Sequence, residues 1–319
     1  SMGATVIVAH AFGAGNTDGL GLAAKQSTIA TLVLSVIISI VVFLFSRPLL
    51  VLMGADGDVV DKGTRFQQIS AVGFVFMAVM FVLGGALRGV GDTRTPMLVT
   101  LATLILSLIL AYPLTFGGAG LPALGVFGAG LASTIARALG CVVLLALLAR
   151  PASAVRIAGR ADWRPAAGPL RRLASIGLPS MFEGLFRSAG MLMFTVIVFQ
   201  LGTAVVAAQQ IVQQAAFLSM MPGFGFSMAA MTLVGQSLGA NNPTRASRAS
   251  WFSTRSCLAW MGTMGLVFFF GGPPIMRLFT SDPEIIALGA AALKVIALAQ
   301  PGQAFGMVLA GSLRGAGDT

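Results

Sequence analysis

Charged and catalytic side chains are scarce in this sequence. Asp, Glu, Lys and Arg make up 9% of the 319 residues, against roughly 25% in soluble domains. The single histidine, His10, leaves almost nothing from which to build a zinc cluster or a histidine-based triad. The two cysteines, Cys141 and Cys257, lie in apolar runs without metal-ligand spacing, which is typical of packing residues. These residues predict no metal site, and the lack of a GxxxxGK loop argues against nucleotide hydrolysis.

Long uncharged stretches dominate instead. Hydrophobic residues are 56% of the chain, and the stretches 26–46, 66–87 and 256–276 are each long enough to cross a hydrocarbon core of about 30 Å as a helix. They lack the two-residue alternation of barrel strands, so helices are the structure that satisfies their backbone in lipid. The sequence predicts an all-α, polytopic helical membrane protein. Hydropathy places helices near residues 1–14, 27–53, 66–88, 96–116, 122–149, 171–200, 205–239, 250–279 and 285–313.

The sequence contains an internal repeat. GALRGVGDT at 85–93 recurs as GSLRGAGDT at 311–319, and the same offset of 226 matches Gly13-Ala14 with Gly239-Ala240. Six predicted crossings separate equivalent points, and an even number returns the chain to the same side of the membrane. The copies are therefore expected to form two parallel-oriented lobes of six helices each, related by an axis along the membrane normal. Doubling the repeat implies about 450 residues and twelve helices, so we expect a fragment without the first helix, part of the second and the last two.

The distribution of basic residues predicts the topology. Positive side chains gather in the loops of one side, which is cytoplasmic by the positive-inside rule, and the loops of the other side hold mainly acids. The net charge of +10 is thereby explained by topology and attraction to anionic lipid headgroups, without nucleic acid as a partner. The arginine-rich stretch 151–170 is expected to link an N-terminal lobe, 1–150, to a C-terminal lobe, 171–319. We expect a multi-pass protein of the cell (inner) membrane.

The repeated LRGxGDT box has the chemistry of a cytoplasmic turn between helices. Its glycines allow a sharp reversal, and its arginine lies at a helix C-terminus. In the first box, either Asp92 or Thr95 can cap the next helix. Gly85 and Gly89, and again Gly311 and Gly315, are spaced for close helix packing. A second role stays open, in which the charged pairs of the boxes form a gate. These pairs are Arg88 with Asp92 and Arg314 with Asp318.

Several motifs together resemble the multidrug and toxic compound extrusion (MATE) family over essentially the whole chain. They are the two boxes, VAHAFGAGN at 8–16, VGQSLGANN at 234–242, IGLP at 176–179, LGTAVVAAQQI at 201–211 and MPGFGFSMA at 221–229. The resemblance implies a secondary antiporter that exports organic cations, drugs and other amphiphiles in exchange for protons or sodium ions, by alternating access of two lobes. Its expected partners are those substrates and membrane lipids, its state is a monomer, and no cofactor beyond the coupling ion is implied.

Glu183 is the acidic residue that falls inside a predicted membrane helix. It lies 11 residues beyond Arg172, roughly 16 Å deep at 1.5 Å per residue and therefore close to the midplane. Because ionisable groups in membrane helices are costly, a carboxylate there is a candidate site for a proton or a cation. The alternative is a fixed ion pair with Arg187, one helical turn further on.

Three glutamines complete the set of candidate ion- or substrate-binding residues. Gln209 and Gln213 share a helical face, and Gln300 adjoins a proline in a later helix. Such amides suit a polar cleft, and they serve equally as hydrogen bonds between helices. Arg137 and Lys294 are also deep in predicted helices, so the positive charge there exceeds the negative.

That positive excess keeps a second function open, because a flippase for lipid-linked oligosaccharides shares this architecture and tolerates a basic cleft. A membrane-embedded enzyme is the third alternative. It would need a nucleophile or a metal set at membrane depth, which the sequence does not supply.

Overall fold

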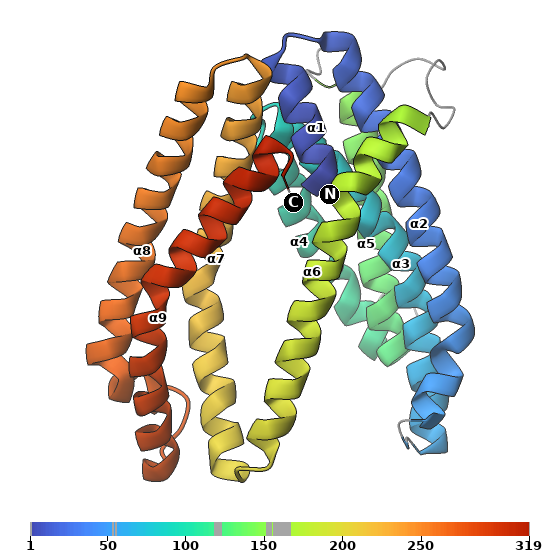
Figure 1. Ribbon diagram of the computed structural model, residues 1–319. Helices are drawn as coiled ribbons and strands as arrows, with labels where there is room; N and C mark the ends of the chain where they lie inside the picture. Colours follow the sequence, from blue (N-terminus) through green and yellow to red (C-terminus); the bar gives the residue numbers. More distant parts are fainter. Residues whose placement is uncertain are drawn as a thin grey trace. The chain divides into compact units, whose positions relative to one another are not determined.

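The computed structural model describes residues 2–52, 54, 56–117, 123–150, 155 and 167–318. Within these residues the chain is helical and contains no strand, which confirms the predicted all-α class. Figure 1 shows the helices in chain order. They are α1 Met2–Gly13, α2 Thr17–Leu52, α3 Gly57–Gly89, α4 Arg94–Phe116, α5 Val126–Ala149, α6 Ala167–Phe199, α7 Thr203–Gly239, α8 Pro243–Arg277 and α9 Pro283–Ala316.

Several helices begin earlier than hydropathy predicts, and side-chain caps explain the early start of α2 and α8. α2 begins at Thr17 rather than near residue 27, and α8 begins at Pro243 rather than near 250. The backbone N–H of Gly19 donates to Oδ1 of Asn16 at 2.8 Å, and that of Arg245 donates to Oδ1 of Asn242 at 2.9 Å. A side-chain acceptor at this position satisfies an otherwise unpaired helical N–H. Hydropathy misses these polar first turns because their start is decided by hydrogen bonding.

The internal repeat is present in the backbone. Gly15 and Asn241, 226 positions apart, both have positive φ, +68° and +53°. Gly91 and Gly317 share φ values of +94° and +91°, which a residue with a side chain adopts only with strain. The turn hydrogen bonds also repeat, since Asp92 N–H donates to Leu87 O and Asp318 N–H to Leu313 O, each at 3.0 Å. The LRGxGDT boxes therefore end α3 and α9 with the same Schellman-type turn.

The chain divides into two compact units, Ser1–Leu173 and Ala174–Thr319. In unit 1, α3 packs against α1, α2 and α5, and α4 packs against α5. Its buried core includes Val8, Leu83, Leu144 and Leu148. In unit 2, α7, α8 and α9 pack against one another, as they lie in Figure 1. Residues 151–154 and 156–166, most of the predicted linker, lie outside the described residues.

Glycines permit close helix contacts inside each unit. A Cβ added at Gly89 of α3 would lie 2.9 Å from the carbonyl oxygen of Thr5 in α1. At the equivalent position of α9, a Cβ on Gly315 would lie 2.5 Å from the carbonyl oxygen of Met231 in α7. Gly311 likewise lies against the backbone of Ser227. The predicted close packing of these box glycines is confirmed for the three positions.

The outer surfaces of the helices are apolar, as lipid requires. Eight helices in the described part of the chain are long and apolar enough to cross a membrane. Large hydrophobic side chains are exposed along them, for example Leu44, Leu108 and Leu266. Because contact between such large apolar surfaces and water is unfavourable, they are stable only against hydrocarbon or another protein surface. The chain is a multi-pass membrane protein.

Candidate functional site

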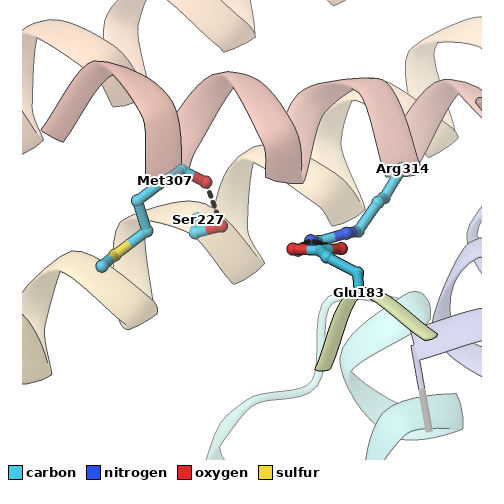
Figure 2. Close-up of polar contacts among 4 residues, drawn as sticks. All are labelled: Glu183, Ser227, Met307 and Arg314. Atoms are coloured by element: carbon cyan, nitrogen blue, oxygen red, sulfur yellow. Dashed lines mark hydrogen bonds and ion pairs between the residues drawn. The ribbon is translucent and has the colours of Figure 1, made fainter. Parts of the chain in front are cut away.

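The candidate site lies in unit 2, and its best-defined feature is an ion pair between α6 and α9. Nη2 of Arg314 donates to Oε1 of Glu183 at 2.7 Å and to Oε2 at 2.5 Å (Figure 2). Glu183 lies midway along α6, and Arg314 lies in the last turn of α9. The carboxylate side chain is 54% exposed and the guanidinium 17%. The acid is thus accessible to a proton while its partner is held by packing.

This partner differs from the one that the sequence offered. Arg187 was the expected alternative partner of Glu183, one helical turn away, and that pairing is wrong. An ion pair between Glu183 and Arg187 would require both side chains to lie along the surface of α6. The carboxylate of Glu183 instead points to Arg314, which lies on α9. Arg187 forms no ion pair within the described residues.

The charged residues of the two boxes do not pair with each other. Neither Arg314 with Asp318 nor Arg88 with Asp92 forms an ion pair in the part of the chain that the structure describes. Asp92 instead caps α4, because its Oδ1 accepts from the N–H of Thr95 at 3.0 Å. The geometry shows a turn at each box, and a gate formed by these residues stays a prediction.

A pocket of about 840 Å³ lies between α6 and α7, one helical turn from the ion pair. It brings together three residues that the sequence singled out, Arg187, Gln209 and Gln213. α6 does not pack closely on α7, α8 or α9 in the residues described, which leaves this space between the helices. The remaining lining is mostly amide, methionine and aromatic, with Thr195, Val198, Val206 and Ala216 between them; the amide, methionine and aromatic residues are Gln210, Gln214, Met191, Met220, Phe194, Phe199, Phe217 and Phe224.

Gln300 does not line this pocket. Its side chain is fully buried, and its Oε1 accepts from the hydroxyl of Ser219 at 3.3 Å, which joins α9 to α7. The indole N–H of Trp260 in α8 donates to the carbonyl oxygen of Ser219 at 3.0 Å. Of the two roles open for this amide, the structure shows the hydrogen bond between helices.

The pocket has the composition of a site for an organic molecule. Its volume falls within the usual 300–1,000 Å³ of ligand pockets. Methionine and phenylalanine side chains adapt to varied apolar shapes, and the amides offer both donors and acceptors. The one charged residue in its lining is Arg187, and the lining contains no carboxylate and no nucleophile with a base beside it. The arrangement can bind and orient a molecule without reacting with it.

Sequence reasoning missed two of the amides, Gln210 and Gln214. They follow Gln209 and Gln213 directly, in the segment AAQQIVQQAA, so each is about 100° further around α7. The expectation of a single polar face excluded them. The doubled amide pattern was the available signal, since it predicts a polar arc wide enough to line a pocket.

Comparisons with known proteins agree with this fold. The sequence model of the MatE family matches residues 1–113 and 179–319. A probable multidrug resistance protein NorM from Thermotoga maritima is 32% identical over 322 residues, covering 100% of this chain and 68% of that protein. An uncharacterized transporter, YisQ from Bacillus subtilis, is 25% identical over 317 residues, covering 99% of this chain and 69% of its own length.

Solved structures show the same fold. A crystal structure of MATE in complex with MaD3S superposes with a TM-score of 0.90 at 23% identity, covering 99% of this chain and 70% of that one. A MOP superfamily transporter from Pyrococcus furiosus, described for the reverse polarity of its binding pocket, has a TM-score of 0.89 at 22% identity, with 99% and 70% covered.

Proposed function

Because the chain belongs to the MatE family of transporters, we propose that it exports small amphiphilic or cationic organic molecules, drugs among them, in exchange for protons or sodium ions. Such a protein lies in a cell membrane, which in bacteria is the inner membrane. The observation that carries the proposal is the α6–α7 pocket beside the ion pair of Glu183 and Arg314. A substrate site and an ionisable switch then occupy the same helix, α6.

The proposed coupling works through the strength of that ion pair. Glu183 as a carboxylate accepts two charge-assisted hydrogen bonds from Arg314, which hold α6 to the end of α9. A proton or a sodium ion on the carboxylate cancels the charge that attracts the guanidinium. α6 then separates from α9, and the pocket that it lines changes shape. In the proposed cycle this movement contributes to alternating access.

The test is transport in proteoliposomes that contain the full-length protein. Dye export is measured under a proton gradient and, separately, under a sodium gradient, for the parent and for Glu183→Gln. The neutral amide keeps the shape of the carboxyl group and loses its charge, so gradient-driven export is expected to fall by about tenfold or more. Glu284→Gln, at the exposed first turn of α9, is the matched control and is expected to export normally. Export by Glu183→Gln equal to the parent under both gradients would refute the coupling role.

A second function, flipping of lipid-linked oligosaccharides, is favoured by one observation. Arg187 is the charged residue of the pocket lining, and a guanidinium suits the diphosphate of such lipids better than an organic cation. Translocation of a fluorescent lipid-linked oligosaccharide in the same liposomes separates the two. If the parent moves this lipid and exports no dye, the antiporter proposal is wrong.

A further inference from the structure

A second cavity, in unit 1, has a different chemistry. About 280 Å³ in volume, it lies between α3, α4 and α5, and its walls carry two arginines and four hydroxyl groups. Arg88 comes from α3 and Arg137 from α5. The hydroxyl groups are those of Thr100, Thr103, Ser107 and Ser133. The rest of the lining consists of Gly84 and apolar side chains, and it contains no carboxylate.

Arg88 is a guanidinium in need of an acceptor. Its Nε is buried and has no hydrogen-bond partner among the described residues. The side chain lies back along its own helix, next to Gly84. A Cβ added at Gly84 would lie 3.3 Å from Nη1 of Arg88 and 3.3 Å from Cβ of Pro96. The missing side chain of Gly84 thus makes room for the charge at the wall of the cavity. A buried donor without a partner is costly, which points to an acceptor that the cavity receives.

Arg137 places a second positive charge further along the cavity, near Gly73 of α3. It lies in the middle of α5, and a Cβ on Gly73 of α3 would lie 3.4 Å from its Nη1. Gly73 and Gly84 are 11 residues apart, about 16 Å along a helix, so the two guanidinium groups do not share one small ion. Neither arginine forms an ion pair within the described residues. The cavity therefore repels cations along its length.

The hydroxyl groups and the apolar wall complete the recognition of an amphiphile. Thr103 and Ser133 donate to carbonyl oxygens of their own helices. The side chains of Thr100 and Ser107 make no hydrogen bond in the described structure, so their hydroxyl groups remain available as donors. Phe81 and Leu104 also line the cavity and are exposed, so it opens on an apolar surface.

We propose that the α3–α4–α5 cavity binds an amphiphilic organic anion, whose carboxylate, phosphate or sulfonate group is held by Arg88 or Arg137 while its apolar body lies between them. The anionic group comes either from a membrane lipid or from a molecule in water, since both present the same chemistry. This site is separate from the α6–α7 pocket and does not depend on the transport proposed for it. It adds organic anions to the classes of ligand that we propose for the protein.

The test is equilibrium binding to the full-length protein in nanodiscs of phosphatidylcholine. Radiolabelled dodecyl phosphate is the anionic probe, and dodecyltrimethylammonium, of equal chain length, is the cationic one. The parent is expected to bind the anion at least about tenfold more tightly, which corresponds to about 1.4 kcal/mol. Arg88→Gln and Arg137→Gln are each expected to raise the Kd for dodecyl phosphate by about tenfold. Arg94→Gln, an exposed arginine beside the box, is the matched control with an unchanged Kd.

Two further measurements keep the result interpretable. Thr100→Val and Ser107→Ala remove a single hydroxyl group each, without disturbing charge, and are expected to weaken anion binding by a smaller factor. Phosphatidylglycerol nanodiscs identify the source, because a lipid occupant competes with dodecyl phosphate in the parent and a water-borne one does not; both results support an anion site. Equal binding of the two probes by the parent, or an unchanged Kd in both arginine variants, would overturn the proposal.

Discussion

At the residue scale, one arginine position has different contacts in the two units. Arg88 and Arg314 occupy the same place in the LRGxGDT repeat, and both boxes make the same backbone turn. Arg314 reaches Glu183 of α6, whereas Arg88 folds over Gly84 and lines a cavity. A repeated motif therefore determines where the guanidinium begins, and the neighbouring helices determine what it binds. Function belongs to these sites rather than to the repeat.

The box glycines lead to a prediction at this scale. Gly315→Ala is expected to destabilise the protein by roughly 1–3 kcal/mol, because its Cβ would lie 2.5 Å from the carbonyl oxygen of Met231 and the backbones must separate. The measurement is the free energy of unfolding in detergent, from the loss of helical circular dichroism. Gly306→Ala in the same helix is the control, since nothing lies within 4 Å of its Cβ. It is expected to be neutral or slightly stabilising, by roughly 0.5–1 kcal/mol. Equal effects of the two changes would contradict the close approach.

At the scale of single helices, the ends are determined by local hydrogen bonds and the middles by lipid and packing. The caps at Asn16 and Asn242 add polar first turns to α2 and α8. The Schellman-type turns at Gly91 and Gly317 stop α3 and α9 at equivalent places. Between these ends, α3 is buried by α1, α2 and α5, whereas the described side chains of α6, at 181–199, are largely exposed. An exposed helix that lines a pocket is the element most free to move.

The caps give the prediction that belongs to this scale. Asn242→Ala is expected to destabilise α8 by about 1 kcal/mol, because the N–H of Arg245 loses its acceptor. Hydrogen exchange of the first turn of α8 measures the effect locally. Asn242→Asp keeps an oxygen at this position and adds a charge that the helix N-terminus favours, so it should exchange as slowly as the parent. Faster exchange in Asn242→Asp than in Asn242→Ala would exclude the capping role.

At the scale of the whole molecule, the two units contain cavities of different chemistry. Unit 1 has the α3–α4–α5 cavity with two arginines, and unit 2 has the α6–α7 pocket with amides, methionines and phenylalanines. Gln300, which the sequence placed with the other amides, serves instead to hold α7 and α9 together. The repeat thus produces two units whose helices correspond and whose cavities differ.

A charge exchange tests the link that spans unit 2. Glu183→Arg and Arg314→Glu are each expected to abolish export, because each places two like charges at the α6–α9 contact. The double variant restores opposite charges and is expected to recover part of the export, measured as dye transport in proteoliposomes at equal protein content. A double variant no better than either single one would show that the contact does not control transport.

The sequence by itself determined the class of this protein, the number and order of the helices in the described residues, and the repeat. Lipid excludes any backbone that is not internally hydrogen-bonded, so runs such as 66–87 and 256–276 could only be helices. The spacing of the box glycines, four residues apart, likewise predicted close helix packing, which the structure has at Gly311 and Gly315. The sequence also singled out four residues on chemical grounds alone, which are Glu183, Arg187, Gln209 and Gln213.

The tertiary structure decided which of these side chains meet. Arg314 lies 131 positions from Glu183, and no local period relates the two, so the nearer Arg187 was the partner that a helical pattern could offer. The same holds for Gln300, whose burial against Ser219 depends on how α9 packs on α7. Helical periodicity describes one element at a time, whereas a site forms where the faces of several elements converge. That convergence is set by packing and by the space that packing leaves.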